Sequence, residues 1–419
     1  MKQKEAPMFL KKRNPLQMKI KMPTSSQPPL RFLRRQSILH LLLKLGAVSC
    51  LPAFAAEEDV FQPYVGYSFA YDEGINLPGN SDNQNLSDTS RRAEAGLAIR
   101  KHISQQVLSA KLNVAHVNYD KFNTLNNDSK DLLGNWNWHV GNRVEGNLGA
   151  SYLQKLSLEP SAGGYALQLS TKRREFFDGS WLVHPSWRLR GGLSRDKLNY
   201  GVDSVNDLNE IVSELGLDYL ARSGSMVGMQ LRHTRGKLPN QQSVGNNYDQ
   251  NELKAKIDWL LTGKTQLQFL GGYVQRQHDS NSVRDYSGLN ARVIANWKPT
   301  GQVGVTLSGW REIGAPDNLT TGYDDSGSPT SSSYTLNHGI SIGSTWDATS
   351  KLRLAGLLKH ETRDFRDEAG RKDTFRTASV KLTYRATDHL QLATLLYRNG
   401  ISGDNNPNTG MMLSSRYEF

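Results

Sequence analysis

Polar side chains, several of them charged, recur at every second position in several segments, and the charged ones are best placed to do chemistry. Between residues 253 and 259 the odd positions are apolar, and Lys254, Lys256 and Asp258 hold the even ones. Segments 289–297 and 378–385 repeat the alternation, with one lapse at Ile294. Lys and Arg side chains in such rows could bind anions through ion pairs and bidentate hydrogen bonds. That chemistry requires an element that turns all of them to one face.

Patterns typical of catalytic and metal sites are missing. The histidines after residue 55 are scattered, without a His-Glu-x-x-His or comparable metal-binding spacing. Residues 404–410 resemble a calcium loop, but the Gly comes one position late and the closing acid is missing, so we interpret them as a turn. No local Ser-His-acid pattern or phosphate-binding Gly loop occurs. We expect no enzymatic activity, no cofactor and no metal.

The elements that position the charges are predicted to be β-strands. After residue 55 the period is two rather than that of an amphipathic helix, so each segment has one apolar and one polar face. Short turns alternate with longer polar loops. The turns are predicted near 104–106, 140–142, 184–186, 222–225, 262–265, 298–301, 347–350 and 386–389. The loops are predicted near 74–90, 123–129, 158–165, 200–207, 237–248, 279–285, 315–333, 366–372 and 402–410. These connections imply about 18 strands.

Aromatic residues recur at one end of the predicted strands. Each stands just before a short turn, and the set comprises Trp181, Tyr219, Trp259, Trp297, Trp346 and Tyr384. Trp and Tyr at one fixed strand height are typical of the interfacial girdle of a membrane barrel. The alternative is the core of a soluble β-sandwich, which does not require one residue class at one strand end. Trp310 could not be assigned to either face.

The chain ends on an alternating segment that finishes with Tyr417 and Phe419. A terminal strand of this form resembles the assembly signal of bacterial outer-membrane proteins. Backbone polar groups cannot stay unpaired in hydrocarbon, and only a closed sheet has no edges. We therefore predict an all-β fold, a transmembrane antiparallel β-barrel of about 18 strands with short periplasmic turns and longer extracellular loops.

The first 55 residues differ in composition from the rest. They hold 11 of the 51 Lys and Arg and one of the 40 Asp and Glu, so 40 basic and 39 acidic side chains remain. A nearly neutral body excludes a nucleic-acid partner. Cationic residues 31–35, a short apolar run and an Ala-x-Ala site at 53–55 predict a secretory signal peptide, residues 1–55. The natural start could be Met1, Met18 or Met22, and Cys50 could alternatively carry a lipid.

The remaining residues, 56–419, are predicted to form a single outer-membrane barrel domain. If the apolar faces meet lipid, the polar faces line the lumen. The candidate lumen-lining charges are Arg188, Arg190, Lys254, Lys256, Arg292, Lys381 and Arg385. Two interpretations of them stay open: a cationic arc that binds anions, or a solvated wall of mixed charge in which acids such as Glu214 and Asp218 share the interior.

Several segments resemble the EpsL-like outer-membrane β-barrel family associated with exopolysaccharide biosynthesis and export loci. The resemblance rests on the order and spacing of residues 65–73, 87–89, 136–139, 184–189 and 417–419. The first loop, with residues 73–77, departs from the family pattern. The resemblance implies a part in exopolysaccharide biosynthesis or export, as a passive channel or accessory for polymer passage. It also implies polysaccharide and periplasmic export components as partners.

The residues themselves leave other functions open. A general or solute-selective porin has the same pattern, and so has a closed structural or docking barrel. In each case we expect location in the bacterial outer membrane, contact with outer-membrane lipid, and insertion by the barrel-assembly machinery through the C-terminal strand.

Overall fold

The predicted alternation forms strands throughout the described part of the chain. The computed structural model describes residues 60–75, 86–161, 164–202, 204–240, 247–280, 282–313, 335–365, 371–402 and 407–419, and for residues 158–166, 205 and 283 the backbone alone. The signal peptide prediction lies outside these residues. The barrel belongs to one compact unit, residues 54–419.

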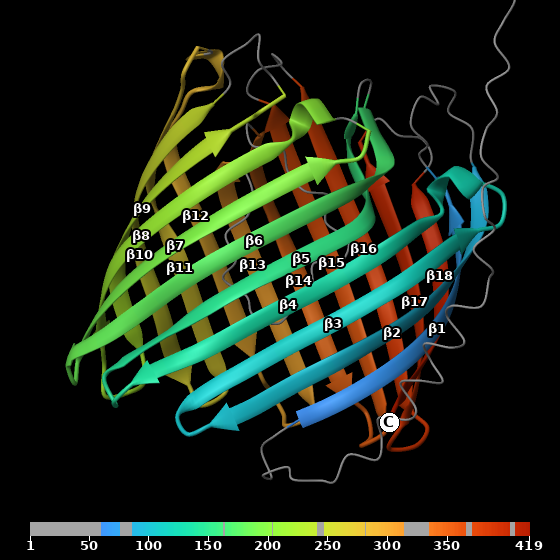
Figure 1. Ribbon diagram of the computed structural model, residues 1–419, viewed down its shortest axis with the longest axis horizontal. Coiled ribbons are helices and arrows are strands. Elements are labelled where there is room, and N and C mark those ends of the chain that lie inside the picture. The colour runs from blue at the N-terminus through green and yellow to red at the C-terminus, as the bar shows by residue number, and fades with distance from the viewer. Residues whose placement is uncertain are drawn as a thin grey trace, which may run out of the picture. The chain divides into compact units, whose positions relative to one another are not determined.

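Eighteen β-strands make up the described structure (Figure 1). Their bounds are β1 Val60–Glu73, β2 Ser87–Ile103, β3 Gln106–Tyr119, β4 Asn127–Val140, β5 Val144–Ser161, β6 Gly164–His184, β7 Trp187–Tyr200, β8 Leu208–Leu220, β9 Met226–Lys237, β10 Tyr248–Thr262, β11 Thr265–His278, β12 Tyr286–Trp297, β13 Val303–Ile313, β14 Thr335–Asp347, β15 Leu352–Phe365, β16 Lys372–Arg385, β17 Leu390–Ile401 and β18 Asn408–Glu418. Three short 3-10 helices lie between strands: η2 Asn123–Leu125, η3 Ser204–Asn206 and η4 Ser282–Arg284. Among the described residues, no helix is long and apolar enough to cross a membrane.

Every strand pairs antiparallel with its neighbours in sequence, and the sheet closes on itself. β1 pairs with β2 on one side and with β18 on the other, where Tyr64 lies opposite Glu418. Closure leaves no strand with an unpaired edge, which satisfies the backbone hydrogen bonds without water. The predicted 18-stranded antiparallel barrel is thus confirmed.

The predicted turns agree with the structure, whereas one predicted loop was wrong. All eight short turns join the strands where the sequence placed them, from 104–105 between β2 and β3 to 386–389 between β16 and β17. At 158–165 we expected a long polar loop, but backbone pairing continues up to Ser161 opposite Gly164. A hairpin needs only about two residues outside the ladder, so strands can run through polar sequence.

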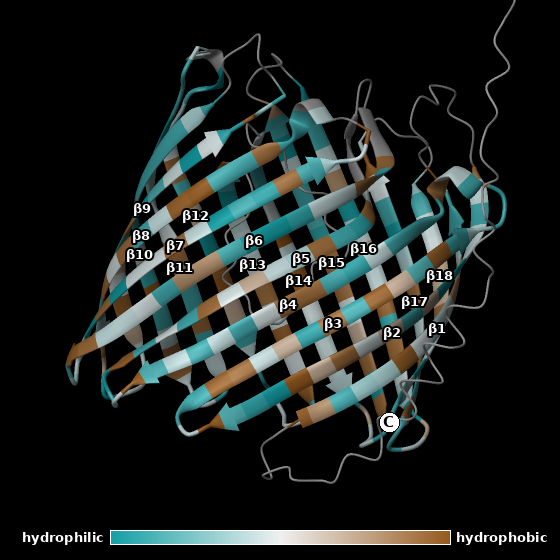
Figure 2. Cartoon of the chain, in the orientation of Figure 1, coloured by the Kyte–Doolittle hydropathy of each residue, from teal (hydrophilic) through white to brown (hydrophobic). Residues whose placement is uncertain are grey.

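Hydrophilic and hydrophobic residues alternate along many of the strands (Figure 2), so the two faces of the wall differ in chemistry. Large apolar side chains on the outward face are exposed, for example Leu289 at 64%, Ile340 at 66% and Leu358 at 59%. Their sequence neighbours point inward, and many of them are polar and buried, such as Asn290 and Glu361. An apolar exterior with a polar interior is the arrangement of a membrane barrel rather than of a soluble sandwich.

Large inward side chains lie over glycines on the adjacent strand. Three tyrosines sit directly opposite a glycine, in the pairs Tyr64–Gly96, Tyr248–Gly236 and Tyr397–Gly410. A Cβ atom at any of these glycines would collide with the tyrosine ring. The missing side chain therefore lets an aromatic ring lie flat against the wall and cover the glycine backbone.

Candidate pore lining

Arg188 and Arg190 of β7 converge on one carboxylate. Asp218 of β8 is fully buried and lies 2.9 Å from Arg188 Nη2 and 2.6 Å from Arg190 Nε. Register brings them together, because Arg188 lies opposite Asp218 and Arg190 lies opposite Gly216. Gly228 on the next strand leaves room for the carboxylate, which a Cβ there would strike. Two guanidinium groups thus share one acid, and Glu145, Asp178 and Glu214 line the same hollow of the wall.

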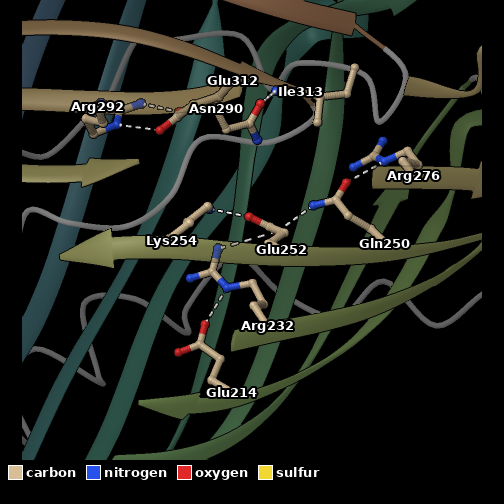
Figure 3. A network of polar contacts seen from close by, with 10 residues as sticks. All are labelled: Glu214, Arg232, Gln250, Glu252, Lys254, Arg276, Asn290, Arg292, Glu312 and Ile313. Atoms are coloured by element: carbon tan, nitrogen blue, oxygen red, sulfur yellow. Dashed lines mark hydrogen bonds and ion pairs between the residues drawn. The ribbon is translucent and has the colours of Figure 1, made fainter. Parts of the chain in front are cut away.

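A chain of ion pairs continues around the wall on β8 to β10 (Figure 3). Arg232 Nε donates to Glu214 at 2.6 Å, and Arg232 Nη1 lies 4.0 Å from Glu252. Glu252 also pairs with the buried ammonium of Lys254. These side chains point into the lumen, whereas Leu253, between Glu252 and Lys254, points outward. The charges in this stretch balance, because two acids face two bases.

Arg276 extends the same network on β11. Its Nε donates to Gln250 Oε1 at 2.6 Å, and Gln250 Nε2 donates to Glu252 Oε1 at 2.5 Å (Figure 3). The guanidinium carbon lies 4.1 Å from the centre of the Tyr248 ring, which is 1% exposed. A guanidinium held against an aromatic face is oriented by both contacts. These residues fix a rigid polar layer on the inside of the wall.

The next part of the lining, on β12 to β15, centres on Trp310 of β13. The Trp310 ring centre lies 5.3 Å from Arg292 Cζ and 5.3 Å from Lys359 Nζ. Arg292 makes a bidentate pair with Glu312, at 3.0 and 2.7 Å. Trp310 faces the lumen, since it lies opposite Arg292 and Gly339 in the register. The sequence did not reveal this orientation.

Glu361 of β15 holds two further cations beside Trp310. It lies 3.2 Å from Lys359 Nζ and 2.8 Å from Arg363 Nη2. The Arg363 side chain is buried, and its guanidinium carbon lies 4.2 Å from the centre of the Phe375 ring. As at Asp218, two bases face one acid.

Of the three remaining predicted cations, Lys381 and Arg385 lie apart from these clusters, whereas Lys256 lies near the charges of the Asp218 cluster. Lys256 is half-buried and lies opposite Gly228 and Leu270. Lys381 and Arg385 of β16 share the inward face but are exposed. Lys381 lies opposite Ala355 and Leu395, and Arg385 opposite Gln391, so neither has an acid directly across the ladder.

Sequence reasoning missed Glu252, Arg276, Glu312 and Arg363 as members of the lining. Glu252 and Glu312 stand two residues from Lys254 and Trp310 on their own strands. Arg276 and Arg363 lie on β11 and β15, an even number of residues from the position that the register places in line with Lys254 or Trp310. Period-two counting from Lys254 would have found Glu252. Pairing across strands requires the register, which the sequence does not state.

The six predicted girdle residues all lie near the short-turn end with exposed side chains. Trp259 is 49% exposed, Trp297 50% and Tyr384 44%, and Trp181, Tyr219 and Trp346 are similar. Their role at a membrane interface stays a prediction. Tyr417 and Phe419 also point outward and make a T-shaped contact with ring centres 5.2 Å apart. Recognition of these two residues by the assembly machinery also stays a prediction.

Selective fluorescence quenching tests the outward orientation of Trp297 and the lumenal orientation of Trp310. We expect brominated lipids to quench Trp297, which faces outward, and aqueous iodide to quench Trp310, which lies between two lumen cations. A variant that keeps Trp297 as its single tryptophan, with the others replaced by Phe, should therefore be quenched by brominated lipid and spared by iodide, and a variant that keeps Trp310 alone should do the reverse. Equal lipid-dependent quenching of the two single-tryptophan variants would contradict the assignment.

No group of His, Cys, Asp and Glu within the described residues could hold a metal ion. The described part of the lining is an arrangement of fixed charges along a wall. Such a wall can attract, orient and pass charged solutes, because the side chains replace part of the water around an ion.

Comparisons with known proteins agree with this geometry. Residues 249–409 match the family model described as "Putative beta-barrel porin 2". The crystal structure of Pseudomonas aeruginosa OccK2 (OpdF) has a TM-score of 0.50 and 11% identity, with 86% of this chain and 97% of that chain covered. The outer membrane protein opdK of P. aeruginosa has a TM-score of 0.47 and 12% identity, with coverages of 86% and 99%. Acinetobacter baumannii OccAB4 gives 0.48 and 11%, with 87% and 100% covered.

The chain therefore shares the closed 18-stranded barrel fold of an outer-membrane porin structure, and part of it resembles a porin family. At such identities the solved structures establish the fold alone. No curated protein matches the sequence. That the chain is not an enzyme stays a prediction.

The predicted resemblance to the EpsL-like family was wrong. The matches are to a porin family model and to OccK-type barrels, and neither supports a role in exopolysaccharide biosynthesis or export. The segments that carried the resemblance are strand alternations, aromatic strand ends and a terminal Tyr-x-Phe. Any barrel in a lipid bilayer needs these features, so they indicate the architecture and not the family.

Proposed function

We propose that this chain is a passive porin of the bacterial outer membrane that lets small solutes cross through a hydrated lumen. The observation that carries the proposal is a closed wall whose inward face bears charged side chains that are still exposed, including Lys111, Arg353, Lys381 and Arg385. An exposed ammonium or guanidinium inside a closed barrel implies water in the lumen, because an ion without solvation there would cost several kcal/mol.

Exposed lumen cations support a preference for small anions. Lys381 and Arg385 point inward and have no acid directly across the ladder. By contrast, Lys111 pairs with Asp131 at 2.9 Å and Arg353 with Asp347 at 2.5 Å. Anions would meet a wall that is mixed in charge but positive at Lys381 and Arg385.

Planar bilayer recordings test both parts of the proposal. We expect steady conductance that needs no energy source, and a reversal potential that indicates modest anion preference in a salt gradient. Reversing two exposed lumen charges, in Lys381→Glu with Arg385→Glu, should lower the anion-to-cation permeability ratio several-fold. Lys197→Glu on the outward face of β7 is the matched control and should leave the ratio unchanged.

The alternative is a closed structural or docking barrel. Such a barrel would give no conductance above the lipid background with the original protein or with the charge variants. That outcome would overturn the proposed pore, whereas conductance without ion preference would overturn only the selectivity.

A further inference from the structure

A groove lies on the outward face of the wall, across β12 to β17. Its volume is about 1330 Å³. Leu307, Ile340 and Leu358 line its apolar part, and His360, Arg376 and Arg398 line its polar part. Outward grooves of this kind face lipid in an inserted barrel, so the occupant must suit both parts.

The floor of the groove is open because two glycines lie there. A Cβ atom at Gly309 would meet only the Gly339 carbonyl oxygen, at 3.9 Å. A Cβ atom at Gly400 would meet only Pro407 Cβ, at 3.8 Å. Elsewhere on the inside of the wall, glycines are covered by aromatic rings, as Tyr248 covers Gly236. The hollow above Gly309 and Gly400 is free for an apolar chain from outside.

The basic residues form a compact cluster on three neighbouring strands. His360 lies directly opposite Arg376, and Arg398 lies opposite Ala378, two residues along the strand from Arg376. All three are exposed, and the described residues provide none of them with a hydrogen-bond or ion-pair partner. Arg376 and Arg398 carry like charges at diagonal ladder positions and repel one another, so an anion placed between them would relieve the repulsion.

The order of apolar and basic residues is the same on each strand. On β15 His360 follows Leu358 toward the long-loop end, on β16 Arg376 lies beyond Ala378, and on β17 Arg398 lies beyond Leu396. A ligand must therefore place acyl chains along the middle of the wall and negative charge near the long-loop rim. Long loops of outer-membrane barrels face the cell exterior.

We propose that this groove binds a phosphorylated acyl glycolipid of the outer leaflet, of the lipid A type. Phosphate groups accept charge-assisted hydrogen bonds from Arg376 and Arg398, and the acyl chains fill the hollow over Gly309 and Gly400. The proposal rests on membrane insertion in the proposed orientation, but not on an open pore.

A second outward groove, of about 520 Å³ across β8 to β11, provides a contrast. It has a similar apolar part, with Leu231 and Leu253, but its polar part holds His233 and Asn251. These two bond each other at 2.8 Å, and His233 also lies 3.7 Å from Asp249. Its polar groups are satisfied within the protein, so we expect no bound phosphate there.

Native mass spectrometry of the full chain in detergent, titrated with bisphosphorylated lipid A, tests the site. We expect one tightly bound lipid, and binding about tenfold weaker after dephosphorylation of the lipid or in Arg376→Gln with Arg398→Gln. The matched control removes two outward arginines elsewhere, in Arg195→Gln with Arg235→Gln, and should retain the affinity. Gly309→Leu should weaken lipid binding, because its side chain fills the hollow.

Competition with inorganic phosphate and with phosphatidylglycerol shows whether the groove prefers lipid A to other phosphate compounds. Inorganic phosphate should not displace the lipid at millimolar concentration if the acyl chains contribute, and phosphatidylglycerol should compete poorly because it carries one phosphate. Equal affinity in the two double variants, or equal competition by phosphatidylglycerol, would overturn the proposal. Bilayer conductance should be the same in all these variants, so a closed pore would not affect the outcome.

Discussion

Replacing Asp218 with Asn is expected to lower the free energy of unfolding by about 3 kcal/mol, because it leaves two guanidinium groups without their common counter-ion. Asp218 is fully buried, while the side chains of Arg188 and Arg190 are 26% and 20% exposed. Breaking a buried pair from one side costs about 3–5 kcal/mol. The lower end applies here since both arginines keep some contact with lumen water.

Two comparisons separate this effect from a general loss of charge. Asp347→Asn breaks an ion pair of similar geometry with Arg353, but that pair is exposed and should contribute less than about 1 kcal/mol. Arg188→Gln should also cost less than Asp218→Asn, because Arg190 keeps two hydrogen bonds to Asp218, at 2.6 and 2.9 Å.

Urea titration of the refolded protein in lipid vesicles measures these differences. Bilayer recordings of the same Asp218→Asn protein should show stronger anion preference, since two lumen arginines lose their acid. If Asp218→Asn and Asp347→Asn destabilise the barrel equally, then burial does not set the strength of the Asp218 cluster.

Local features of the sequence were sufficient for the architecture. Period-two alternation marks a strand without knowledge of its neighbours, and turn residues mark its ends, so the number of strands and all short turns could be predicted. The outward positions of Trp259 and Trp297 followed from the same alternation. The prediction failed at the hairpin between β5 and β6, because its polar composition resembled a loop. Backbone pairing does not depend on side-chain polarity.

The lining could be predicted only in part, because cross-strand partners depend on register. Lys254 was expected to line the lumen, but its burial against Glu252 depends on the side chains around it, which register brings together from β9 to β11. Trp310 illustrates the same limit: its contacts with Arg292 and Lys359 join strands 18 and 49 residues apart in sequence. A cationic arc and a wall of mixed charge were the two interpretations, and Glu214, Glu252 and Glu312 are paired with the lumen cations around them.

Replacing Tyr64 with Ala is expected to weaken the seam at which the first and last strands close the barrel. Tyr64 is 3% exposed, its hydroxyl accepts a hydrogen bond from Asn113 at 2.5 Å, and Arg416 Cζ lies 3.6 Å from its ring centre. Truncating a buried aromatic residue costs about 3–5 kcal/mol. β1 and β18 are the most distant paired strands in sequence, so their pairing closes the longest loop and has the largest entropic cost. The loss of Tyr64 removes contacts that offset this cost.

Matched variants distinguish the contributions to the seam. Tyr67→Ala, on the same strand but outward and 51% exposed, should cost less than about 1 kcal/mol. Tyr64→Phe keeps the ring and loses the hydroxyl bond, so about 1 kcal/mol is expected. Arg416→Ala should cost about 1–2 kcal/mol, and a double-mutant cycle with Tyr64→Ala should give a coupling energy near this value if the stacked contact is the main link.

Closure can be followed separately from stability by gel electrophoresis without boiling, in which a closed barrel migrates faster than the unfolded chain. We expect Tyr64→Ala to lower the closed fraction after refolding and Tyr67→Ala to leave it unchanged. A coupling energy near zero between Tyr64 and Arg416, together with normal closure of Tyr64→Ala, would mean that backbone pairing of β1 with β18 closes the barrel without these side chains. The seam would then depend on the ladder from Tyr64 opposite Glu418 to Glu73 opposite Thr409.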